Sequence, residues 1–230
     1  MEKLTDFLFI ALVLILAAIL IAWSARQRVP GVAGLGLIGW LALTGSLAIR
    51  GFFQDWSSLP PRILPAAFAP LVAGLLLFFY SRQTRALLAA TPLQWPLYLQ
   101  SFRIVMEIIL WLLFVQHRVP AIMTFEGRNA DILVGLTAIP VGYFCFVRKA
   151  WPKRVALWWN VISVLVLLNV VVHAQLSTPT FRVFVTDPPV TFIGEWPYVW
   201  LPGFLVPLAW LLHAASIIQI RRWGEGRSSS

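Results

Sequence analysis

The residues most able to do chemistry in this sequence interrupt an apolar stretch. Arg103 and Glu107 stand four residues apart in the block Leu97–Gln116, on one helix face and within reach of an ion pair. A charge in the middle of a bilayer costs at least about 2.5 kcal/mol by insertion scales, so such residues usually face the protein interior and pair. If Arg103 contacts Glu107, the carboxylate is a fixed charge; if Arg103 turns away, Glu107 is free to carry a proton.

Other polar residues are predicted at a similar depth on three further helices. Counting about 1.5 Å per residue from each helix end places this set in the inner half of the protein. The set is Arg103, Glu107, Tyr143, Asn160 and His213. We expect these side chains to converge on one polar cavity that binds a small-molecule ligand. The alternative is a structural Arg103–Glu107 pair, with the other residues bonded locally.

A second group of candidate residues is predicted at the opposite, outer face. Its members are His117, Glu126, Arg128, Asn129, Asp131 and His173. They suit a substrate mouth or an extracytoplasmic reaction site, but Asn129 or Asp131 could equally cap the helix that follows. No spacing typical of a metal site joins them, and His173 and His213 are predicted at opposite depths, which disfavours a haem between them. The sequence therefore predicts no metal and no cofactor.

The elements that must position these residues are seven apolar blocks of helix length. About 20 apolar residues are needed to cross a hydrocarbon core of roughly 30 Å. The predicted spans are residues 5–23, 31–49, 64–80, 97–116, 131–147, 155–173 and 199–220. Residues 81–96 predict a short interfacial segment, and the long connection 174–198 predicts a small hairpin or a cover. The sequence thus predicts an all-α integral membrane protein, a seven-transmembrane-helix bundle.

Composition agrees with this class and excludes others. Of 230 residues, 60% are hydrophobic and 12% charged, against about 25% charged in soluble domains. The chain has room for a single transmembrane domain over residues 1–223, with a tail over 224–230 that we expect to be disordered. We expect the first span to be retained rather than cleaved. The net charge of +9 is spread between helices, so it indicates membrane lipids and not nucleic acid as partners.

The distribution of lysine and arginine predicts the orientation. Eleven basic residues fall in the first, third and fifth connections and the C-terminal tail, six fall on the other side, and Arg103 completes the 18. Under the positive-inside rule, the N-terminus lies outside and the C-terminus in the cytoplasm. The expected location is a bacterial cytoplasmic (inner) membrane.

Two segments of the sequence resemble each other. Leu64-Pro65 followed by Pro70-Leu71 matches Leu201-Pro202 followed by Pro207-Leu208. The match suggests a 3+1+3 parallel repeat of helices. This layout resembles that of SWEET-type sugar facilitators, although the first span has no proline and no Pro-Gln motif occurs. A retinal protein is excluded, because the predicted seventh span has no lysine to form a Schiff base.

Three classes of function remain open from the sequence. Transport or binding of a small solute through a polar cavity formed by the fourth to seventh spans is favoured. One alternative is a membrane enzyme acting on a lipid, with either His213 and Glu107, or His117 and His173 with Glu126, as candidates. The other alternative is a scaffold or sensor subunit of a larger membrane complex. A scaffold or sensor subunit would contact a second copy of the chain or a partner protein through the small-residue face of Gly36, Gly39 and Gly45.

Overall fold

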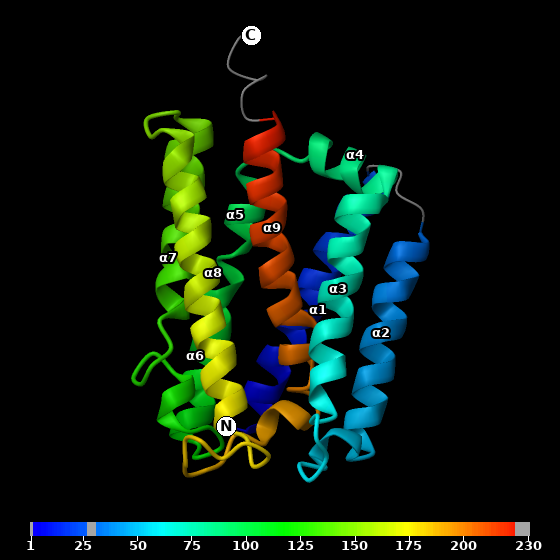
Figure 1. The fold of residues 1–230 in the computed structure, drawn as a ribbon, viewed down its shortest axis with the longest axis vertical. Coiled ribbons are helices and arrows are strands. Elements are labelled where there is room, and N and C mark those ends of the chain that lie inside the picture. Colours follow the sequence, from blue (N-terminus) through cyan, green and yellow to red (C-terminus); the bar gives the residue numbers. More distant parts are fainter. Residues whose placement is uncertain (1, 27–30, 224–230) are drawn as a thin grey trace.

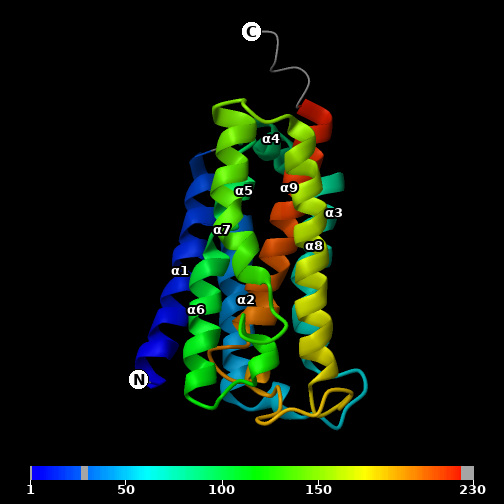
Figure 2. The same ribbon diagram turned by 90° about the vertical axis from the view of Figure 1, so that its left-hand side faces the viewer.

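The computed structural model describes residues 2–26 and 31–223 as a bundle of helices along one long axis (Figure 1). No strand occurs in these residues, so the all-α prediction is confirmed for them. The C-terminal tail, for which disorder is predicted, lies outside the described residues. The connections alternate between the two ends of the bundle (Figure 2).

Each predicted span coincides with one helix or with two consecutive helical segments. The longer helices are α1 (Glu2–Arg26), α2 (Val32–Ile49), α3 (Ile63–Tyr80), α6 (Phe102–Val115), α7 (Asp131–Gly142), α8 (Lys153–Leu176) and α9 (Val206–Trp223). The shorter ones are η1 (Phe52–Gln54), α4 (Arg82–Ala90), α5 (Trp95–Leu99), η2 (Ala121–Met123), η3 (Tyr143–Val147), η4 (Phe192–Gly194) and η5 (Leu201–Leu205). In the described residues, five helical stretches are long and apolar enough to cross a membrane: Glu2–Arg26, Ile63–Tyr80, Trp95–Val115, Lys153–Leu176 and Leu201–Arg222. This is compatible with membrane integration.

Three of the seven predicted spans are not uniform α-helices. The fourth predicted span breaks at Gln100 and Ser101, between α5 and α6, where the Ser101 hydroxyl donates to the Tyr98 carbonyl at 2.7 Å. The helix α7 contains Pro140 and continues as the π-helical turn η3, and the π-helical η5 contains Pro202. Proline removes a backbone donor, so the local pattern widens around it.

The two proline-containing segments that resemble each other lie side by side and run in the same direction. A Cβ at Gly74 would overlap Leu211 of α9, and a Cβ at Gly203 would lie 3.8 Å from the Ala66 carbonyl oxygen. Residues 74 and 211, like residues 66 and 203, differ by 137 positions, so one register holds along both contacts. This register applies to α3 against η5 and α9, and the wider repeat remains a prediction.

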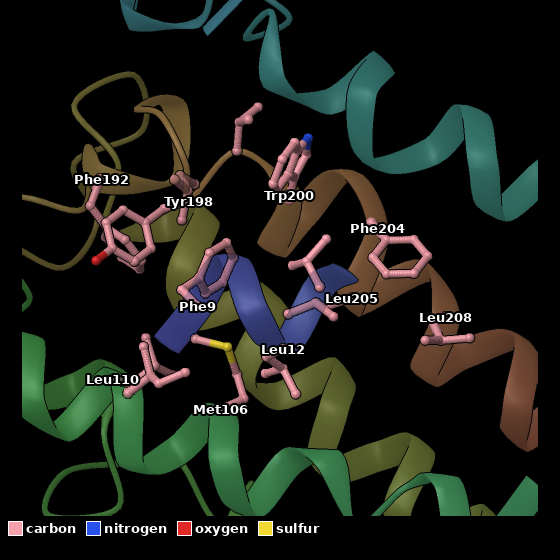
Figure 3. Packing of buried hydrophobic residues seen from close by; sticks show 14 of the residues in the cluster. Phe9, Leu12, Met106, Leu110, Phe192, Tyr198, Trp200, Phe204, Leu205 and Leu208 are labelled. Carbon is pink, nitrogen blue, oxygen red and sulfur yellow. The ribbon is translucent and has the colours of Figure 1, made fainter. Parts of the chain in front are cut away.

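A hydrophobic core closes the end of the bundle near the N-terminus. The Phe9 ring of α1 is tilted against the Tyr198 ring at 4.9 Å between centroids, and the Phe192 ring meets the Tyr198 ring edge to face at 5.9 Å (Figure 3). Phe192, Ile193 and Tyr198 are at most 3% exposed, so the long connection is a cover. The hairpin alternative is wrong, because residues 177–200 form turns and the 3₁₀ helix η4 without strand pairing.

The short helix α4 lies across the opposite end of the bundle (Figure 1). Ser81 caps it, since its hydroxyl oxygen accepts from the Thr84 amide at 3.2 Å. The segment predicted within residues 81–96 is therefore present as a helix. Its place across the bundle end is the one that an interfacial segment would take.

Candidate functional site

The helix α6 buries two charged side chains one turn apart. Arg103 and Glu107 are each 2% exposed. The break before α6 lets the helix start at Phe102, and Gln100 in that break donates to the Ala209 carbonyl of α9 at 3.0 Å. The start of α6 is thereby fixed against α9, so its charged face is turned into the bundle.

The partner of Arg103 lies on another helix. Its Nη1 is 3.1 Å from Oδ1 of Asp131, and these two side chains are 2% and 10% exposed. Asp131 is the first residue of α7, where the positive end of the helix dipole favours a carboxylate. The ion pair therefore joins α6 to α7 and leaves Glu107 without a salt bridge in the described part of the chain.

Glu107 is held by an amide instead. The Asn129 side chain donates to Glu107 Oε1 at 2.7 Å and to the Met123 carbonyl at 3.0 Å. The same side chain accepts a hydrogen bond from the Asp131 backbone amide at 2.9 Å. Asn129 thus holds the first amide of α7 and positions Glu107 as well, while the capping position itself is Ala130, which has no side-chain cap.

These contacts form because α7 begins well inside the end of α6. A Cβ at Gly135 would lie 2.9 Å from the Ile104 backbone nitrogen, so these two residues are level in the antiparallel pair. Asp131 is therefore level with a residue about seven positions before Val115, or about 10 Å from the end of α6 at 1.5 Å per residue. The connection between the helices turns back along the bundle axis to reach the start of α7 (Figure 2), and its Met123 and Thr124 are at most 2% exposed.

A cavity of about 80 Å³ adjoins this buried cluster. One buried water needs roughly 10–15 Å³, so there is room for several waters or one small solute. The charged residues that line the cavity are Arg103, Glu107 and Asp131. The rest of the wall is mainly apolar, from α6, α8, η5 and α9, with Gln175 of α8 as a further polar member.

Several polar atoms of the cluster have no hydrogen-bond partner among the described residues. Apart from Arg103 Nη1 and Asp131 Oδ1, which face each other in the ion pair, these are Nε and Nη2 of Arg103, Oε2 of Glu107 and Oε1 of Gln175. A buried polar group without a partner costs about 1–3 kcal/mol, and more if it is charged. The cavity therefore presents both donors and acceptors, which fits a small solute that carries both.

The cluster contains two carboxyl groups and one guanidinium group. With both carboxylates ionised its net charge is negative, and an uncompensated buried charge is expensive. A bound proton or an additional positive charge would neutralise it. Glu107, which shares no ion pair, is the natural place for either.

The other residues predicted in the inner-half cluster do not line this cavity. Asn160 Oδ1 is 2.8 Å from His213 Nδ1, and Asn160 donates to the Ser216 hydroxyl at 2.9 Å, so these three link α8 to α9. Tyr143 is 42% exposed. The prediction that it joins the cavity is wrong, because Gly142 packs against Tyr98 and the next residue points about 100° away.

The outer-face candidates divide into two groups. Asn129 and Asp131 belong to the buried cluster. Glu126 accepts a hydrogen bond from the Trp111 indole at 2.6 Å, and Arg128 Nη1 is 3.4 Å from His173 Nε2. His117 occupies the turn after α6 with a φ of 58°. Across residues 2–26 and 31–223, no three His, Cys, Asp or Glu side chains gather closely enough to hold a metal ion.

The structure brings together residues that the sequence places at opposite depths of the bundle. Gln175 is a further lining residue that is not among the candidates predicted from the sequence. The sequence predicts Arg103 and Glu107 in the inner half, but Asn129 and Asp131 at the outer face. One signal was available: Asp131 opens a block of only 17 residues, which is short for a full crossing. A short helix that begins with a carboxylate is consistent with a start inside the bundle.

Fold and site together define the class: an all-helical bundle with several apolar helices of membrane-crossing length and a buried, charged cavity. A protein-family model described as "Domain of unknown function (DUF8737)" matches residues 60–221. The chain belongs to this family, and the match contains every residue named above that lines the cavity. No curated protein and no solved structure matches the chain.

Proposed function

We propose that this chain is an integral membrane protein that binds, and by extension transports, a small polar solute in the cavity beside Arg103, Glu107 and Asp131. The observation that carries the proposal is the set of unpartnered atoms on buried, charged side chains that line one cavity. A pair kept only for stability would be expected to satisfy its own hydrogen-bonding groups.

The proposed topology has seven crossings. The five long apolar stretches are joined by two shorter apolar helices, Ala33–Ile49 and Asp131–Val147. Large apolar side chains cover the outside of the bundle. Examples are Phe7 (64% exposed), Leu35 (69% exposed) and Leu165 (59% exposed). Patches of this kind are rare on soluble monomers, and they suit lipid contact.

The proposed orientation puts the N-terminus outside and the C-terminus in the cytoplasm. The end of the bundle with α4 carries nine described basic residues: Arg26, Arg82, Arg85, Arg148, Lys149, Lys153, Arg154, Arg221 and Arg222. No described acidic residue lies at that end. This asymmetry favours a cytoplasmic face at a bacterial inner membrane.

In this proposal the two charged residues of α6 have different roles. The Arg103 guanidinium donates to an acceptor on the solute, while Asp131 balances its charge. Glu107 Oε2 accepts from a donor on the solute or takes up a proton. Asn129 holds the other oxygen of Glu107, so movement of the connection that contains Asn129 would alter the site directly.

The proposal predicts that Glu107→Gln abolishes retention of the solute. Native mass spectrometry of the protein extracted in mild detergent would reveal a small adduct on the parent, whose mass identifies it. We expect the adduct to be lost from Glu107→Gln and kept by Glu126→Gln. The control alters a carboxylate on the exposed side of the same connection.

Two results of that experiment would contradict the proposal. One is an adduct retained equally by Glu107→Gln and the parent. The other is a parent protein that carries no adduct under conditions in which it remains folded. Either result would leave the cluster with a structural role only.

A second candidate function is that of a subunit that associates through α2. A Cβ at Gly36 or Gly39 would meet nothing within 4 Å, so this part of the helix is uncovered. Gly45 does not extend that open face, because Trp196 covers it. The lipid-enzyme alternative has less support, since His213 is bonded to Asn160 and not to Glu107.

A further inference from the structure

A second, larger cavity lies at the basic end of the bundle. Its volume is about 490 Å³, within the range of roughly 300–1,000 Å³ typical of ligand pockets. Its wall comes from α1, α3, α4, α5 and α9, and includes Leu20, Trp23, Leu87, Leu99, Leu211 and Ala215. It shares no lining residue with the cavity beside Arg103.

The helix α4 that bounds this cavity is held in place by specific hydrogen bonds. Gln219 of α9 is 1% exposed and donates to the carbonyls of Leu88 and Thr91. The Trp23 indole of α1 donates to the Thr91 hydroxyl at 3.0 Å. Side chains of α1 and α9 therefore hold α4 in a fixed position, and this position defines the shape of the cavity.

The chemistry of the cavity is apolar inside and cationic at the edge. Arg26 is the one charged residue in the lining formed by the described part of the chain. It is exposed, and none of the described acidic side chains forms a salt bridge with it. The eight other described basic residues at this end extend the positive field, and no described acidic residue offsets it.

From this combination we infer that the cavity is a binding site for an anionic phospholipid. One acyl chain fills the apolar interior, and the phosphate lies at Arg26. Basic side chains at a cytoplasmic surface attract anionic headgroups, and buried methylene groups supply the remaining affinity. A zwitterionic phospholipid would fill the same volume but would gain little from the positive field.

The experiment is native mass spectrometry of the full chain in mild detergent with phosphatidylglycerol or phosphatidylcholine of identical acyl chains. We expect phosphatidylglycerol to be retained preferentially. Arg26→Gln should weaken its retention about fivefold, and Ala22→Phe, which adds bulk to the cavity wall, should weaken it further. Arg50→Gln and Ala42→Phe, exposed positions away from the cavity, should match the parent.

Equal retention of the two lipids, or parent-like retention of phosphatidylglycerol by both Arg26→Gln and Ala22→Phe, would overturn the inference. Thermal unfolding of each variant verifies that it is folded. Since Glu107 does not line this cavity, Glu107→Gln should retain phosphatidylglycerol like the parent. The lipid site and the solute site can therefore fail separately.

Discussion

At the scale of single residues, the buried charges are partnered across helices and not along one helix. The spacing of Arg103 and Glu107 permits an ion pair within α6, but their order, arginine before glutamate, is the less favourable one. Asp131 gives Arg103 a partner that also benefits from the start of α7. Glu107 is left with Asn129, and this difference in partners separates a structural carboxylate from one available to a ligand.

The Arg103–Asp131 pair predicts strongly non-additive substitutions. Asp131→Asn should destabilise the protein by about 3 kcal/mol, because it leaves the buried Arg103 guanidinium without the carboxylate that it contacts. Arg103→Met combined with Asp131→Leu should lie within about 1 kcal/mol of the parent, because neither charge remains. The free energy of unfolding in detergent measures both effects.

A control for this comparison is Asp55→Asn. Asp55 forms a surface ion pair with Arg62, with side chains 33% and 41% exposed, so its loss should cost under about 1 kcal/mol. A double variant as unstable as Asp131→Asn alone would contradict the account of the buried pair.

Tyr198 predicts how stability depends on pH at the N-terminal end. Its hydroxyl donates to Asp6, and burial, followed by this hydrogen bond, raises its pKa above the ordinary value of 10.0. The contribution of Tyr198 to stability is fully present below pH 10 and is lost as pH rises further, because the unfolded chain releases its proton first. We expect the unfolding temperature of Tyr198→Phe to fall less steeply than that of the parent above pH 10.

The matched control for the pH experiment is Tyr80→Phe, at a side chain 79% exposed. It should keep the pH profile of the parent. Identical profiles for the parent and Tyr198→Phe would rule out the proposed contribution.

At the scale of elements, hydropathy predicts where helices occur but not how deep their ends lie. An apolar block of about twenty residues predicts a helix at its own position in the sequence. In lipid the backbone must form its hydrogen bonds internally, and a helix does so within one segment. The fold-back of residues 116–130 has no such signal, since its residues are polar and apolar in turn. Its depth follows from the contact of Gly135 with Ile104, which depends on packing between distant segments.

Glycine substitutions test the packing of α7 on α6. Gly135→Ala should destabilise the protein, because the new Cβ would overlap Ile104. Gly36→Ala should stabilise it by about 0.5–1 kcal/mol, because the site is open and alanine favours helix. Thermal unfolding of both variants shows whether each substitution stabilises or destabilises the protein. An unchanged unfolding temperature for Gly135→Ala would contradict the close approach of α7 to α6. A loss of self-association in Gly36→Ala would favour the second candidate function.

At the scale of the whole molecule, the proposed orientation predicts which loops a reagent reaches. Ser57→Cys should react with a membrane-impermeant maleimide on intact cells, while Arg148→Cys should react only after permeabilisation. The native Cys145 is 3% exposed, so its background reaction should be low. The reverse pattern would invert the topology and place the basic end outside.

We propose that the cavity beside Arg103 and Glu107 holds a solute. An experimental density map of the parent protein in lipid at high resolution tests it most directly. The account predicts non-protein density within hydrogen-bonding distance of the Arg103 guanidinium and Glu107 Oε2. A closed cavity, in which those nitrogens bond to protein acceptors, would contradict it.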